Sequence, residues 1–171
     1  MPSTVLGLPA HVLLVHAAVI FVPVAAALFI GIGWRKAWRQ RYGFILAGMA
    51  VVGFGSAFFA QQTGGVLRRS IRSAAEAAGA SRVDFGSHPQ EGNAAMLSAF
   101  LFAVATIAVV LIDRRQRIAR DGGKSPLPGW APSAAYAVAS VPALLAIVTM
   151  VAAGHSGATL VWHSLGNYVH A

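Results

Sequence analysis

Four long apolar segments dominate the pattern of hydrophobic and polar positions along the chain. They cover about residues 12–34, 42–59, 94–112 and 134–153, and none of them contains Asp, Glu, Lys or Arg. Because about 20 apolar residues in a helix cross the hydrocarbon core of a bilayer, each segment predicts a transmembrane helix. The pattern therefore predicts an all-α, polytopic membrane protein, in which residues 1–171 form a single bundle of four transmembrane helices arranged as two helical hairpins.

The basic residues fall unevenly on the connections between these segments. The connections after the first and third segments hold nine of the 13 Lys and Arg residues, namely Arg35, Lys36, Arg39, Arg41, Arg114, Arg115, Arg117, Arg120 and Lys124. These two connections share one side of the membrane, since successive connections alternate. Loops rich in Lys and Arg stay in the cytoplasm, so we expect both termini on the outer side. Aromatic belts are predicted from Trp34, Trp38 and Tyr42 inside and from Trp162 and Tyr168 outside.

The composition supports the same class of protein and excludes others. Only 11% of the residues are charged, whereas a soluble domain typically carries about 25%. The chain therefore has too few charged residues to cover a water-exposed surface of its size. The net charge of +8 lies in short runs between apolar segments, which favours a lipid bilayer as partner and excludes nucleic acid. The absence of cysteine excludes disulfides, iron–sulfur clusters and c-type haem attachment. Residues 1–10 carry no basic residue, so we expect the first apolar segment to be retained rather than cleaved.

The longest connection, residues 61–92, is predicted on the outer side. Within it, residues 66–80 combine helix-forming residues with three arginines, and two interpretations stay open. The segment is either a short amphipathic helix on the membrane surface or a solvated basic loop. Further along, Ser87-His88-Pro89-Gln90 has the spacing of a capping box with proline at the first helical position, which predicts that the third helix begins near Pro89.

Six histidines provide the candidate chemistry, and the predicted topology places all of them in the outer half: His11, His16, His88, His155, His163 and His170. Imidazole ligates haem iron, copper and zinc, and it relays protons near neutral pH. Ionisable groups at membrane depth are costly and are often functional. His16 is predicted to lie deepest and is therefore the first candidate.

The spacing of the histidines limits how they can act together. His11 and His16 are five residues apart, so on a continuous helix they point about 140° from each other. His155 and His163 are about 12 Å apart along a helix, unless the chain turns at Gly154 or Gly157. A shared site must therefore combine different helices, as in redox bundles. The candidate cofactor ligands are His16, His155, His163, His11 and His88, and the candidate metal ligands are His16, His155, His163 and Glu91. The structural alternative is that each histidine caps a helix end, and that Glu91 stabilises a helix N-terminus.

Two motifs resemble a known family. The segment from Gly7 to His16 resembles the "HP-x-x-V-H" opening of an uncharacterised four-helix bacterial membrane protein family, domain of unknown function 2231. The segment from Gly154 to His163 resembles that family's closing "GHxGGxLVYxHG" pattern. The resemblance implies four helices in the bacterial plasma (inner) membrane, gives no established activity, and points to His16, His155 and His163. The chain departs from the family pattern at Ala10, Ala158, Trp162 and Ser164.

This pattern leaves three functions open. The first is a membrane redox protein that binds haem b for electron transfer near the outer face, with copper or zinc as alternatives. The second is a structural or accessory subunit that packs against other membrane subunits or against itself. The third is a transporter or channel. Only Pro23 and Pro142, which could break the helices, favour it, because the apolar segments carry no charged residue for an ion pathway. No nucleophile elbow or phosphate loop is present, so the sequence does not favour an enzyme in its own right.

Overall fold

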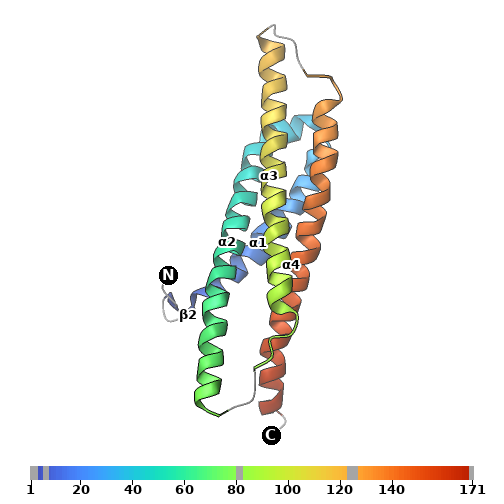
Figure 1. Ribbon diagram of the computed structural model, residues 1–171. Helices are drawn as coiled ribbons and strands as arrows, with labels where there is room; N and C mark the ends of the chain where they lie inside the picture. The colour runs from blue at the N-terminus through green and yellow to red at the C-terminus, as the bar shows by residue number, and fades with distance from the viewer. Residues whose placement is uncertain (1–3, 6–7, 80–82, 123–126, 170–171) are drawn as a thin grey trace.

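Four helices make up nearly all of the described chain (Figure 1). The computed structural model describes the backbone of residues 4–5, 8–79, 83–122 and 127–169, and the side chains of residues 10–79, 83–122 and 127–162. Each helix is long and apolar enough to cross a membrane, which confirms the all-α four-helix prediction. The helices are α1 (Ala10–Gly33), α2 (Lys36–Ala77), α3 (His88–Asp121) and α4 (Ala131–Val169), and a small antiparallel pair, β1 (Thr4–Val5) and β2 (Leu8–Pro9), precedes them.

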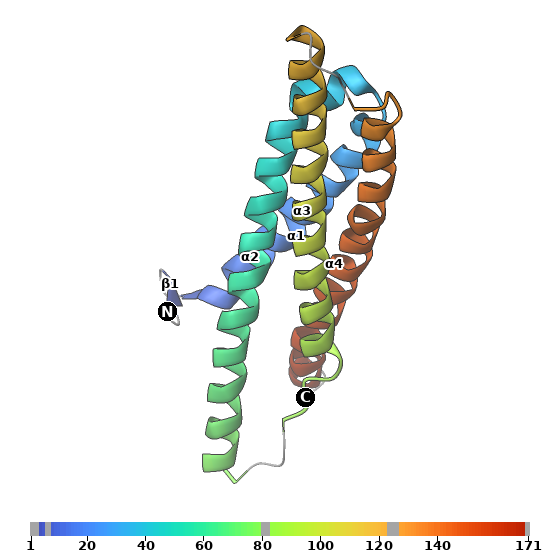
Figure 2. The same ribbon diagram turned by 45° about the horizontal axis from the view of Figure 1, so that its top comes forward.

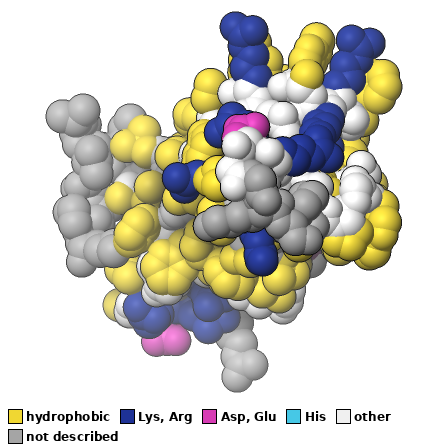
Figure 3. All heavy atoms as spheres, turned by 90° about the horizontal axis from the view of Figure 1, so that it is seen from above, with side chains coloured by type: hydrophobic (Ala, Val, Ile, Leu, Met, Phe, Trp, Pro, Cys, Tyr) yellow, Lys and Arg dark blue, Asp and Glu magenta, His cyan; other side chains and the backbone are white. Residues whose placement is uncertain are grey.

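The helices stand side by side in the order α1, α2, α3, α4 around the bundle, so that α1 and α3 lie on one diagonal (Figures 1 and 2). The α1–α2 and α3–α4 connections meet at one end, which we call the basic end because the lysines and arginines of residues 35–41 and 114–120 gather there (Figure 3). The opposite end, with the α2–α3 connection and the C-terminus, is called the histidine end. It includes the first turns of α1 and α3 and the neighbouring parts of α2 and α4.

The core of the bundle consists mainly of alanine. Ala25, Ala99 and Ala146 are fully buried, and the two largest core rings, Phe29 and Phe102, meet edge to face with 5.7 Å between their centroids. Small residues allow helix backbones to approach closely, which is how helices associate where lipid removes the usual hydrophobic driving force. The large apolar side chains instead lie on the outer faces of the helices, as a surface in contact with lipid requires.

α2 extends well beyond the predicted segment 42–59. It has 42 residues, roughly 63 Å of helix, which is about twice the thickness of the hydrocarbon core. Residues 66–77 are therefore helical, but as a continuation of α2 rather than as a separate surface helix or a loop. The sequence prediction ended where hydropathy falls, but a helix satisfies its own backbone hydrogen bonds and can continue into water.

Two other details of the sequence analysis are corrected by the structure. α3 begins at His88 with Pro89 in its first turn, as predicted, but the side chain of Ser87 makes no capping hydrogen bond. α4 does not end near residue 153: it continues without a turn through Gly154 and Gly157 to Val169. His155 and His163 therefore lie on one continuous helix and stay about 12 Å apart along it.

Aromatic side chains lie at the basic end, as expected at a membrane interface. Trp34, Trp38 and Tyr42 are all exposed. The guanidinium carbon of Arg35 lies 4.9 Å from the ring centre of Trp34 and 5.4 Å from that of Trp38. At the other end Trp162 is exposed, while the side chain of Tyr168 lies outside the described residues.

Candidate functional site

His11 lies in the first turn of α1 and packs onto α2 at the histidine end. Its Nδ1 is 2.9 Å from the carbonyl oxygen of Ala60. The imidazole covers Gly64, one turn further along α2: a Cβ at Gly64 would lie 2.8 Å from Cε1 of His11. The glycine is therefore required for the ring to sit flat on the helix.

His88 occupies the equivalent place in the second hairpin. It is the first residue of α3, and its Nδ1 is 3.1 Å from Oγ of Ser156 on α4. The ring covers Gly157, where a Cβ would lie 2.9 Å from Cε1 of His88. Ser156 is in turn tied to the carbonyl oxygen of Ala153, one turn before Gly157.

The two histidines thus share one local design. Each stands at the start of the first helix of a hairpin, covers a glycine of the second helix, and bonds to backbone or side chain within the turn that precedes that glycine. The glycines follow Ala60 and Ala153 by four residues in both cases. This equivalence supports the two-hairpin plan predicted from the sequence.

Hydrogen bonding determines which nitrogen of each neutral ring carries the proton. A carbonyl oxygen only accepts, so Nδ1 of His11 carries the proton that it donates to Ala60. Ser156 donates its own hydroxyl proton to the carbonyl of Ala153, at 3.2 Å, which leaves its oxygen to accept from Nδ1 of His88. In the neutral imidazoles the lone pair therefore lies on Nε2, the arrangement in which a histidine binds a metal through one nitrogen while the other is held in place.

Glu91 lies one turn into α3, beside His88. Its carboxylate is close to the hydroxyl groups of Ser87 and Ser156, and it interacts electrostatically with His88 and His155. One oxygen, Oε2, is shielded from solvent and has no hydrogen-bond partner among the described residues. A buried carboxylate oxygen without a donor is costly, so this atom can accept a bond from a ligand or a cation.

The other predicted histidines are not drawn into this group. His16 is exposed on α1, and its Nδ1 lies 2.7 Å from the carbonyl of Val12 on its own helix. His155 is also exposed, and the side chains of His163 and His170 lie outside the described residues. Within the described part of the chain, no three His, Cys, Asp or Glu side chains are close enough together to hold a metal ion. Of the described histidines, His11 and His88 are thus the two whose rings bond to a neighbouring helix, whereas His16 bonds to its own.

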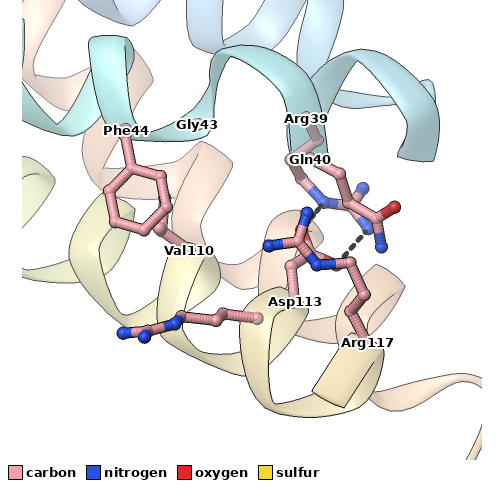
Figure 4. A pocket seen from close by; sticks show the side chains of 8 residues that line it. Arg39, Gln40, Gly43, Phe44, Val110, Asp113 and Arg117 are labelled. Atoms are coloured by element: carbon pink, nitrogen blue, oxygen red, sulfur yellow. Dashed lines mark hydrogen bonds and ion pairs between the residues drawn. The ribbon is translucent and has the colours of Figure 1, made fainter. Parts of the chain in front are cut away.

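The basic end contains a buried ion pair that the sequence analysis missed. Arg39 of α2 and Asp113 of α3 are almost fully buried and paired through two hydrogen bonds, Nε to Oδ2 and Nη2 to Oδ1, the second at 3.2 Å (Figure 4). Nη1 of Arg39 also donates to the carbonyl of Gly33 at 2.8 Å, and its guanidinium carbon lies 5.4 Å from the ring centre of Tyr136. One residue from each helix therefore takes part.

The ion pair was missed because the predicted apolar segments excluded both residues. The second segment was predicted to begin at residue 42 and the third to end at residue 112, so Arg39 and Asp113 counted as loop. A signal was present: Asp113 is a single carboxylate followed by four arginines within seven residues. On a helix Asp113 shares a face with Val109 and Gln116, which are both buried.

The fold and the two polar ends define an integral membrane protein of four apolar helices. A family profile described as "Predicted membrane protein (DUF2231)" matches residues 7–168, and the chain belongs to this family. No curated protein and no solved structure matches the chain. The family identification thus confirms the resemblance found in the two histidine motifs.

Proposed function

We propose that this protein binds a redox cofactor, haem b, at its histidine end and transfers electrons near the outer face of the bacterial inner membrane. One observation carries the proposal: His11 and His88, in equivalent places of the two hairpins, both have Nδ1 engaged, and Nε2 of each has no hydrogen-bond partner among the described residues. Haem would supply the electron-transfer chemistry, and the two imidazoles would bind it from facing helices.

The number of available ligands favours haem over a bare metal ion. Zinc and copper sites need three or four protein ligands, and no group of three candidates is found among the described residues. Haem carries four nitrogen ligands of its own, so the two imidazoles of His11 and His88 would be enough to hold it. Glu91, whose Oε2 lacks a partner, would contribute a negative charge beside the site.

The orientation belongs to the same proposal. The two connections at the basic end carry most of the lysines and arginines, which favours that end in the cytoplasm and both termini outside. Because the chain has no cysteine, single cysteines can report on each side. We expect an impermeant maleimide to label Ser73→Cys on α2 in intact spheroplasts, and to label Ser133→Cys at the start of α4 only after permeabilisation. The reverse pattern would place the histidine site in the cytoplasm.

Optical spectroscopy tests the cofactor. The protein, purified in mild detergent from cells supplied with a haem precursor, is expected to show a Soret band. Asparagine places an amide nitrogen where Nδ1 was but has no counterpart of Nε2, so His11→Asn and His88→Asn should fold and lose the band. His16→Asn, the matched control at an exposed histidine, should keep it.

The outcomes separate the proposal from its alternative. A colourless wild-type protein, or a Soret band that survives both His11→Asn and His88→Asn, would contradict haem binding at this site. Circular dichroism on every variant shows whether lost absorbance reflects lost folding. A colourless protein that co-purifies with a larger membrane assembly would instead favour an accessory subunit.

A further inference from the structure

A shallow groove runs between α2 and α3 at the basic end. Its apolar wall is formed by Gly43, Phe44 and Val110, and its polar rim by Gln40, Arg114 and Arg117, with the Arg39–Asp113 pair between them (Figure 4). These residues recur at helical spacing on each helix, so both helices turn one continuous face towards the groove. The missing side chain of Gly43 helps to keep it open, since a Cβ there would lie 3.0 Å from Val110.

The groove offers positive charge that nothing in the described chain neutralises. Asp113, the carboxylate nearest to it, is already bound by two nitrogens of Arg39. Arg114 and Arg117 are exposed, and neither forms an ion pair with a described carboxylate. The wider basic end, residues 35–41 and 113–124, carries nine Lys and Arg residues against Asp113 and Asp121.

The groove also lies where the basic residues of α2 and α3 give way to their apolar segments, which is the level expected of lipid headgroups. Phe44 is 60% exposed although it belongs to the apolar part of α2, as expected of a side chain that faces lipid. Trp34, Trp38 and Tyr42, which are typical of the interface, are exposed at the same end. An occupant would therefore meet arginines at one end of the groove and an apolar wall at the other.

From this arrangement we propose that the α2–α3 groove binds an anionic phospholipid, with the phosphate between Arg114 and Arg117 and an acyl chain along Gly43, Phe44 and Val110. Basic pockets between transmembrane helices have the chemistry that anionic headgroups need. The inference concerns the end opposite to the haem proposal and does not depend on it. Arg39 does not take part in headgroup binding, because its guanidinium is already paired with the carboxylate of Asp113.

Competition between lipids, followed by native mass spectrometry of the full-length protein, tests the site. The wild-type protein is expected to retain dioleoyl phosphatidylglycerol in preference to dioleoyl phosphatidylcholine. Each arginine near an anionic headgroup contributes roughly a fivefold factor, so Arg114→Gln/Arg117→Gln should reduce this preference about 25-fold, and Arg117→Gln alone about fivefold. Both arginines are exposed, so neither change should affect folding.

A matched control separates the groove from general electrostatic attraction. Arg115→Gln/Arg120→Gln removes the same charge from the same helix, at exposed positions that do not line the groove, and should retain most of the lipid preference. Equal losses in the two double variants would overturn the proposal, as would an unchanged preference in Arg114→Gln/Arg117→Gln. Inorganic phosphate should not displace the lipid at similar concentrations, and displacement would show that the groove is a simple anion site.

Discussion

Each end of the bundle holds polar side chains between helices, buried at the basic end and half-buried at the histidine end, and the bonding of those side chains differs. At the basic end Arg39 and Asp113 satisfy each other, and the remaining guanidinium nitrogen bonds to the backbone. At the histidine end His11 and His88 each use one ring nitrogen, and Oε2 of Glu91 has no partner in the described chain. Oε1 of the buried Gln116, at the basic end, is likewise without a hydrogen-bond partner among the described residues, so the contrast is between the Arg39–Asp113 pair and the histidine cluster rather than between whole ends. A closed pair stabilises the fold, whereas polar atoms that are held in place with a bonding position unused are what a ligand site provides.

The largest loss of stability is expected when the Arg39–Asp113 ion pair at the basic end is broken. Asp113→Asn should lower the free energy of unfolding by about 3–5 kcal/mol, because it leaves the buried guanidinium of Arg39 without a counter-charge. Denaturation in mixed micelles, followed by circular dichroism, measures the change. Asp121→Asn, an exposed carboxylate eight residues along, is the control and should change stability by less than about 0.5 kcal/mol.

Replacement of both partners gives a second measurement on this ion pair. Arg39→Leu/Asp113→Leu should recover much of the stability lost in Asp113→Asn, because no unpaired charge stays buried. If the single and double variants were equally unstable, the loss would come from packing rather than from a buried unpaired charge, and the distinction between the two ends would be weaker.

The next largest effect concerns a glycine at the basic end. In Gly33→Ala the new Cβ would lie 2.5 Å from Cε2 of Tyr136, a ring held by its hydrogen bond to the carbonyl of Ile30 at 2.7 Å. Because this ring cannot easily move, we expect a loss of about 1–3 kcal/mol in the same denaturation assay. Gly31→Ala, two residues earlier with no atom within 4 Å, should be neutral or slightly stabilising.

A smaller effect on stability is expected from the glycines under the histidines. Gly64→Ala and Gly157→Ala would push the rings of His11 and His88 aside, and each ring can swing at a cost of about 1 kcal/mol. The position of Nε2 would change, so the Soret band should weaken or shift in both variants although the fold persists. Gly65→Ala, which meets no atom within 4 Å, should leave spectrum and stability unchanged.

The sequence was sufficient for the fold because one strong signal, hydropathy, decides which segments enter a membrane. It placed all four helices and the start of α3, but it could not place the ends of α2, α3 and α4, since a helix satisfies its own backbone hydrogen bonds and can continue after the hydropathy falls. The sequence made His16 the first candidate, because depth along one helix can be counted from the sequence. It could not show that the rings of His11 and His88 pack on Gly64 and Gly157, since that contact depends on another helix, and the choice of site residues stays a prediction.

The smallest effect should come from Glu91→Gln, and it gives the sharpest comparison because the same carboxylate-to-amide change is made as in Asp113→Asn. Asp113 is bound at both oxygens, whereas Oε2 of Glu91 has no donor to lose. The expected loss is at most about 1 kcal/mol, which corresponds to the interaction of a first-turn carboxylate with the helix dipole. If haem binds as proposed, Glu91→Gln should raise its reduction potential, since a negative charge beside the site disfavours the reduced form. A stability loss as large as that of Asp113→Asn would instead assign Glu91 to the structural framework, and the two ends would then share one role.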